Sequence, residues 1–147
     1  MFNFFSPTNI FLILSRIQKF INSIFFPILI VSLVFALILS PPDRIQGDAM
    51  RIMYVHVPSA WLGLACFSAI TVLSILAFIF KIKNFFYINK SLAPIGLLFT
   101  FLAIVTGSLW GEPTWGTWWV WDARLTSMMF LMFFYISYIL CFKFIKK

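Results

Sequence analysis

Charged residues are scarce in this chain of 147 residues: they make up 10% of it, whereas a soluble domain is roughly a quarter charged. Hydrophobic residues account for 63%, and the mean hydropathy is +1.03. This scarcity excludes a packed water-soluble domain and leaves the lipid bilayer as the solvent. A chain that spans a bilayer forms helices or a closed barrel. The apolar runs are long and unbroken rather than short and alternating, so they predict helices.

Cysteine and histidine are also rare. The two cysteines, Cys66 and Cys141, fall inside predicted spans and have neither disulfide nor metal spacing, so we interpret them as small buried apolar side chains. The single histidine is His56. A zinc site needs about four ligands, so one histidine with cysteines at another depth does not make one.

Acidic residues number four against eleven basic ones, which gives a net charge of +7. The basic residues flank the apolar runs instead of forming a stripe with interleaved aromatics in a polar segment. This placement argues against a nucleic-acid partner and for contact with membrane lipid.

Four apolar segments are close to or longer than the ~20 residues that cross a bilayer. The sequence therefore predicts an all-α polytopic membrane bundle, one membrane domain over residues 1–147. The predicted membrane spans are residues 20–39, 56–80, 91–109 and 125–142. The predicted outer loops are residues 40–51 and 110–124. A cleavable signal peptide is the alternative for the first span. Its run is long for that role, and Pro41 would follow any cut after Ser40, so we expect a retained helix.

The orientation follows from the basic residues. With a cytoplasmic N-terminus, eight of them lie inside and three outside, as the positive-inside rule requires. The three outer ones are Arg44, Arg51 and Arg124. All four carboxylates then lie outside with His56, and both chain ends lie in the cytoplasm.

Five of the six tryptophans fall between Trp110 and Trp121, directly before Asp122. An interfacial anchor explains one or two tryptophans but not five. Glycine and proline at 111, 113 and 116 predict an irregular first half and a short interfacial helix in the second half. A helix would align Trp115, Trp118, Trp119 and Asp122 on one face, and an extended chain would align Trp115, Thr117, Trp119 and Trp121. Either arrangement makes a flat apolar wall.

These outer residues suit a ligand that is planar, apolar on its faces, anionic at one edge and able to accept an axial nitrogen. Haem meets all four conditions, because tryptophans pack on its ring, arginines pair with its propionates and a histidine binds its iron. In the alternative without a ligand, the histidine lies at a helix end and hydrogen-bonds to backbone or lipid headgroups. The arginines are then juxtamembrane charges paired with Asp48 and Asp122. A quinone or a lipid headgroup would also suit tryptophan and arginine but would not need His56.

The stretch WGEPTWGTWWVWDARLT resembles the tryptophan-rich signature of the haem-handling membrane proteins of cytochrome c maturation. Two further segments, RIMYVHVPSAW and SLAPIGLLFTFLAIVTGSLWG, are similar to the haem exporter protein C family of the system I machinery. The resemblance covers roughly Arg51 to Thr126, about half of the chain.

The resemblance implies a subunit that presents haem b on the outer face and delivers it to a haem chaperone. Its implied partners are that chaperone, the subunits of an ABC-type transporter and a small single-span membrane subunit. The implied location is the bacterial inner membrane, or the mitochondrial inner membrane if the gene is organellar. His56 would be an axial ligand of the iron. The other implied haem-binding residues are Arg51, Trp110, Trp115, Trp118, Trp119, Trp121, Asp122 and Arg124.

The sequence departs from the family in two ways. Family members carry about six spans and a second axial histidine, whereas this sequence has four predicted spans and one histidine. We therefore expect a C-terminally truncated product, a split gene or a decaying copy, with the second iron position left to water, a partner or a missing segment. We expect no turnover chemistry. The alternatives are a component of a cytochrome c haem lyase or synthetase, and a structural membrane subunit without haem function.

Overall fold

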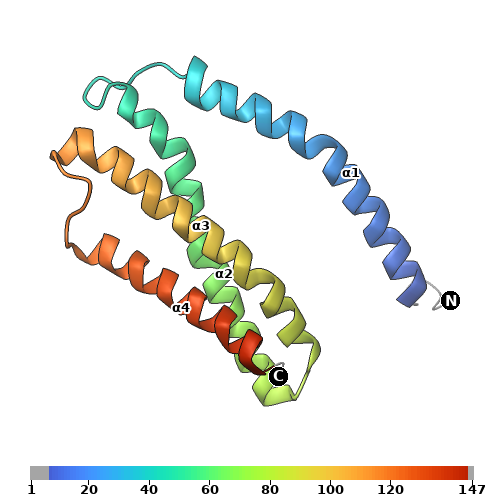
Figure 1. Cartoon of the computed structure of the whole chain (residues 1–147). Helices are drawn as coiled ribbons and strands as arrows, with labels where there is room; N and C mark the ends of the chain where they lie inside the picture. The colour runs from blue at the N-terminus through green and yellow to red at the C-terminus, as the bar shows by residue number, and fades with distance from the viewer. Residues whose placement is uncertain (1–6, 146–147) are drawn as a thin grey trace. The chain divides into compact units, whose positions relative to one another are not determined.

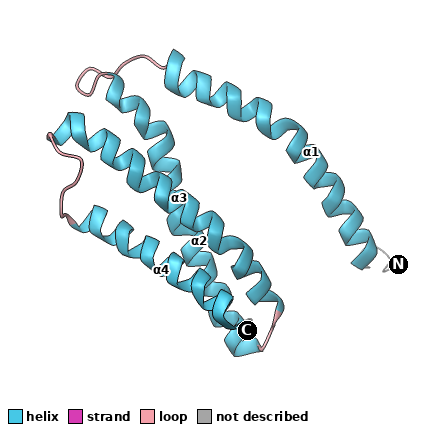
Figure 2. Cartoon of the chain, viewed as in Figure 1, coloured by secondary structure: helices cyan, strands magenta, loops and turns pink. Residues whose placement is uncertain are grey.

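The computed structural model describes residues 7–145, and this part of the chain is helical with no β-strand (Figures 1 and 2). Four helices are long and apolar enough to cross a membrane, as the sequence predicts: the candidate spans are Phe11–Leu39, Asp48–Phe80, Asn84–Trp115 and Ala123–Phe144. The chain divides into two compact units, one ending at Pro41 and the other beginning at Pro42. Each unit is described by itself.

The first unit is one helix. Helix α1 spans Pro7–Val34, and the π-helical turn η2, Phe35–Leu39, continues it. It ends at Ser40, whose backbone is extended (φ −60°, ψ 131°) because the following proline disfavours the helical conformation. None of the described side chains from Phe11 to Leu39 is buried within this unit. From residue 24 to residue 39 this surface is almost entirely apolar, as a lipid-facing helix requires.

The second unit contains three long helices and one short one. The 3₁₀ turn η3, Asp48–Ile52, leads into α2, Met53–Phe80. A three-residue connection then reverses the chain into α3, Asn84–Trp115, and a longer loop leads to α4, Ala123–Ile145. Figure 1 shows α2 and α3 crossing, with α4 alongside them. The loop before η3 and the loop before α4 lie at one end of the unit, and the α2–α3 connection lies at the other.

Small side chains bring α2 and α3 together. Buried residues include Ser59 and Gly63 on α2 and Ala93, Gly96, Thr100 and Ala103 on α3. Small residues allow helices in lipid to approach closely, so that dispersion and interhelical hydrogen bonds replace the missing hydrophobic driving force. The side chain of Asn89 adds a polar bond, because its amide donates to the carbonyl of Ile70 (3.3 Å) and to Ser74 Oγ (2.9 Å). From α4, Tyr135 and Leu131 complete the core around Ile70 and Ala93.

The tryptophan loop does not fold as the sequence predicts. Helix α3 continues through Pro113 to Trp115, and the irregular part is residues 117–122. Gly116 ends the helix in the left-handed conformation (φ 72°), and its N–H donates to the carbonyl of Glu112 (2.9 Å). The prediction was wrong because glycine and proline disfavour a helix only locally, and Gly111 and Pro113 both lie within α3. Gly111 instead makes room for the ring of Trp115, which lies within van der Waals distance of any Cβ placed there.

Candidate functional site: an apolar cavity beside His56

His56 lies in the first turn of α2 and points toward α3. Its Nδ1 is 3.0 Å from the carbonyl oxygen of Ala103 and 3.2 Å from Oγ1 of Thr106. Gly107 faces the edge of the ring, and a Cβ there would lie 3.0 Å from His56 Cε1. The histidine is therefore held against α3 rather than exposed to bulk solvent at a helix end.

A cavity of about 380 Å³ opens beside this histidine, bounded by three helices and the tryptophan loop. Most of its wall is apolar, and His56 and Arg124 are the titratable side chains among its lining residues. The lining residues are Met53, His56, Val57, Ala60, Ala103, Ile104, Gly107, Trp110, Trp115, Trp119, Arg124, Leu125 and Met128. A mostly apolar cavity with a few convergent polar groups is the usual form of a small-molecule site.

Three of the five clustered tryptophans line this cavity: Trp110, Trp115 and Trp119. Trp110 and Trp115 pack edge to face, with ring centroids 5.0 Å apart. The Nε1 of Trp110 donates to Gln46 Oε1 (3.1 Å), which ties α3 to the loop before η3. The Nε1 of Trp119 is buried and has no hydrogen-bond partner among the described residues. An unpaired buried donor is costly.

Arg124 reaches the same cavity from the first turn of α4. Its Nε and NH2 groups both donate to Asp122 Oδ2, at 2.9 and 2.8 Å, and its guanidinium lies 5.5 Å from the ring centroid of Trp115. A guanidinium carries five N–H donors, so several remain for an anionic group. Asp122 itself caps α4, because its Oδ1 accepts from the backbone N–H of Leu125 (2.8 Å).

This cap also sets the charge state of Asp122. The hydrogen bond from the N–H of Leu125, with the neighbouring Arg124 guanidinium, lowers the pKa of the Asp122 carboxyl below its ordinary value. The carboxylate is ionised at neutral pH and orients Arg124. Asp122 thus positions another residue of the site and does not line the cavity.

Besides Asp122, three residues singled out from the sequence do not line this cavity: Arg51, Trp118 and Trp121. Arg51 forms an ion pair with Asp48 at 3.4 Å within η3. Trp118 and Trp121 are exposed on the irregular segment (58% and 76%). Because this segment is not helical, the predicted helical face through Trp115, Trp118 and Asp122 does not form.

Sequence reasoning missed several cavity residues. Met53 lies three positions before His56, so helical spacing alone would have placed both on one face of α2. Thr106, Gly107 and Met128 approach through the packing of α3 and α4 against α2. No pattern in the sequence indicates that register.

The sequence model of the family described as "Heme exporter protein C" matches residues 1–147. "Heme exporter protein C" of Haemophilus influenzae is 45% identical over 107 residues, covering 73% of this chain and 44% of that protein. The protein of that name from Bradyrhizobium diazoefficiens is 37% identical over 132 residues, covering 90% and 50%. A "Putative cytochrome c biosynthesis ccmC-like mitochondrial protein" of Marchantia polymorpha is 48% identical over 98 residues, covering 67% and 43%.

The chain spans about half the length of these relatives. The matched part includes the whole of the cavity, since the family model covers every residue that lines it. By the extent of that match and the identity to its relatives, this chain belongs to the heme exporter protein C family.

Proposed function

We propose that the cavity beside His56 binds haem b and that the protein delivers haem during the maturation of c-type cytochromes. One observation carries the proposal: the only histidine of the sequence opens onto a cavity walled by tryptophans and reached by an arginine. An imidazole for iron, flat aromatic faces for a macrocycle and a guanidinium for a carboxylate edge are the three requirements of a porphyrin site.

The size of the cavity supports a partly exposed ligand. A volume of about 380 Å³ falls in the lower part of the roughly 300–1,000 Å³ range of pockets that bury most of a drug-sized molecule. A porphyrin with its substituents would then be enclosed on one side only. Incomplete enclosure suits a protein that passes its cargo on, because the exposed edge is accessible to an acceptor.

Each residue of the cavity would have a distinct role in binding haem. His56 supplies the nitrogen ligand of the iron, and Trp110 and Trp115 provide apolar contact. Arg124, already oriented by Asp122, pairs with a propionate. Arg51, Trp118 and Trp121 lie outside the cavity wall; we assign them to the exposed rim, where they would meet an acceptor protein.

The wider role rests on the family. The tryptophan loop and His56 would face the outer, periplasmic side of a bacterial inner membrane, or the equivalent side of the mitochondrial inner membrane. Haem would pass from there to a membrane-anchored haem chaperone. The ABC-transporter subunits and a small single-span subunit would be the other members of the complex. The protein itself would perform no bond-forming chemistry; its residues bind, orient and release.

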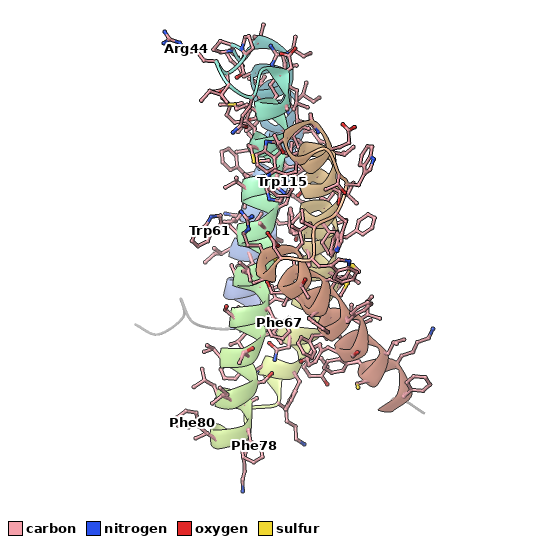
Figure 3. All side chains as sticks on the ribbon, turned by 90° about the vertical axis from the view of Figure 1, so that its left-hand side faces the viewer. Arg44, Trp61, Phe67, Phe78, Phe80 and Trp115 are labelled. Atoms are coloured by element: carbon pink, nitrogen blue, oxygen red, sulfur yellow. The ribbon has the colours of Figure 1, made fainter. Side chains whose placement is uncertain are left out.

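The test is a haem titration of the detergent-purified full chain, followed by absorption spectroscopy. The parent protein should develop a protein-bound Soret band, and His56→Ala should shift or abolish it. Trp61→Phe is the matched control, because Trp61 is 72% exposed and points away from the three-helix unit (Figure 3). If the parent shows no band distinct from free haem in detergent, or if His56→Ala matches Trp61→Phe, the proposal is wrong.

A further inference from the structure

The hydrogen-bond partners of His56 fix the position of its ring proton. Nδ1 is shared between the carbonyl of Ala103 and the hydroxyl of Thr106. A carbonyl oxygen can only accept a hydrogen bond. With the Ala103 oxygen at 3.0 Å, a bare Nδ1 would bring two lone pairs together, so Nδ1 must carry the hydrogen.

The Thr106 hydroxyl leads to the same conclusion independently. A hydroxyl has a single hydrogen, and Thr106 Oγ1 donates it to the carbonyl of Leu102 at 2.6 Å. What Oγ1 offers to His56 is therefore a lone pair. Both neighbours of Nδ1 are acceptors, and the neutral imidazole has its second nitrogen, Nε2, free of hydrogen. A nitrogen in that state can bind a metal ion.

Gly107 sets how closely the ring approaches α3. A Cβ at this position would lie 3.0 Å from Cε1, 3.4 Å from Nδ1 and 3.9 Å from Nε2 of His56. Cε1 and Nδ1 thus form the part of the ring nearest to α3, and Nε2 lies farther from it. A methyl group there would displace the ring and lengthen the Nδ1 hydrogen bonds. The imidazole can take this position because residue 107 has no side chain.

We propose that Thr106 and Gly107 are positioning residues that hold His56 as the Nδ1–H tautomer and direct Nε2 into the cavity. The identity of the ligand bound by Nε2, a metalloporphyrin, rests on the proposed function; the tautomer and the ring position do not. Removing a group that hydrogen-bonds the other ring nitrogen of a metal-binding histidine commonly lowers metal affinity by roughly 10- to 100-fold. The Ala103 carbonyl remains in a Thr106 variant, so the lower figure is expected.

The first experiment needs no haem. Because the sequence has one histidine, full-length protein labelled with ¹⁵N-histidine gives the signals of one imidazole. In mildly alkaline buffer the parent should show a hydrogen-bearing Nδ1 and a bare Nε2. Thr106→Val should increase the Nε2–H form, Thr106→Ser should restore the parent spectrum, and Gly107→Ala should shift both nitrogens.

Thr71→Val is the matched control. Thr71 makes the same bond to the carbonyl four residues earlier (2.9 Å, to Phe67) but is exposed on α2 and does not contact His56. An Nε2–H tautomer in the parent, or identical ring-nitrogen spectra for Thr106→Val and Thr71→Val, would overturn the proposal.

The second experiment separates this proposal from the proposed function. Hemin titration should show about 10-fold weaker binding for Thr106→Val and near-parental binding for Thr106→Ser. Circular dichroism of each variant checks that the helices remain. A parent with the Nδ1–H tautomer but no bound Soret band supports the positioning role and overturns haem as the ligand. A bound band with an Nε2–H tautomer supports haem and overturns the positioning role.

Discussion

The hydroxyl of Tyr135 on α4 donates a 2.7 Å hydrogen bond to the carbonyl oxygen of Gly63 on α2. The tyrosine is fully buried (0% exposed), and its ring lies against Gly96 of α3. One side chain therefore joins all three helices that surround the cavity. The position of the cavity wall depends on this contact, although Tyr135 itself does not line it.

The first prediction concerns the contacts of Tyr135 with Gly63 and Gly96. Tyr135→Phe should lower the free energy of unfolding in detergent by about 0.6–1.7 kcal/mol, the value of one interhelical hydrogen bond in a membrane protein. Gly96→Ala should cost more, about 1–3 kcal/mol, because its new methyl group would overlap the Tyr135 hydroxyl. Denaturation followed by circular dichroism measures both. Tyr138→Phe, one turn away on α4 and half-buried, is the control, and a loss as large as that of Tyr135→Phe would contradict the assignment.

The second prediction concerns the close approach of α2 and α3. A Cβ at Gly63 would lie 2.7 Å from Oγ1 of Thr100, so Gly63→Ala should destabilise the unit by about 1–3 kcal/mol. Adding Thr100→Ala removes that oxygen and should recover part of the loss. The double-mutant cycle measures this coupling. Additive effects of the two substitutions would show that the helices do not meet at this pair.

The third prediction is a pH dependence at the start of α4. The folded-state pKa of Asp122 is depressed, chiefly by the N–H of Leu125. The stabilisation from its ionised form is therefore complete above the ordinary carboxyl pKa of about 4 and is lost as the pH falls through the lower folded-state value. Hydrogen exchange at the amides of Leu125 and Thr126, corrected for intrinsic rates, should accelerate in that range.

Asp122→Asn provides the comparison for this titration. The amide oxygen can still accept from Leu125, but it does not titrate, so the acid-dependent acceleration should disappear. Asp43 also has a pKa lowered by backbone N–H groups, of Gln46 and Ile45, but it lies in another loop. A global stability curve would mix the two carboxyls, and the local amide signal separates them. Acceleration that persists in Asp122→Asn would exclude the cap as its source.

The fourth prediction concerns orientation. Ile45 is 95% exposed at the tip of the loop before η3, and Lys83 is exposed in the α2–α3 connection at the other end. With both natural cysteines replaced by alanine, Ile45→Cys should react with a membrane-impermeant thiol reagent added to intact cells. Lys83→Cys should react only after the inner membrane is opened. The reverse pattern would place the cavity on the cytoplasmic side.

Much of the fold follows from the sequence because lipid imposes a simple rule. Long apolar runs must be helices, so four spans were predictable, and both loops that carry the aromatic and acidic residues were expected at one end. The bond between Trp110 and Gln46 joins the end of α3 to the loop before η3. The boundary of α3 was not predictable from local signals. Pro113 and Gly111 disfavour a helix in isolation, and the packing of Trp115 over Gly111 overrides them.

The residue types of the site were predictable from the sequence, but their arrangement in space was not. His56, Trp115 and Arg124 were identified by their chemistry, and they do share one cavity. Which of the five tryptophans line the cavity, and which lie on the surface, depends on the path of the chain after the left-handed turn at Gly116. The contacts that hold the imidazole depend on the register between α2 and α3, which arises from the close contact of Gly63 with Thr100.

The unusual length of α3 has a further consequence for where the cavity lies in a bilayer. Its 32 residues make a rod of roughly 48 Å at 1.5 Å per residue, whereas the hydrocarbon layer is only ~30 Å thick. An upright α3 would therefore extend beyond that layer, and we expect its tryptophan-bearing last turns to supply part of the excess. The chain then descends through residues 117–122 before α4 begins (Figure 1). The cavity, which these last turns of α3 border together with the start of α4, would then lie near the lipid headgroups and not in the middle of the bilayer.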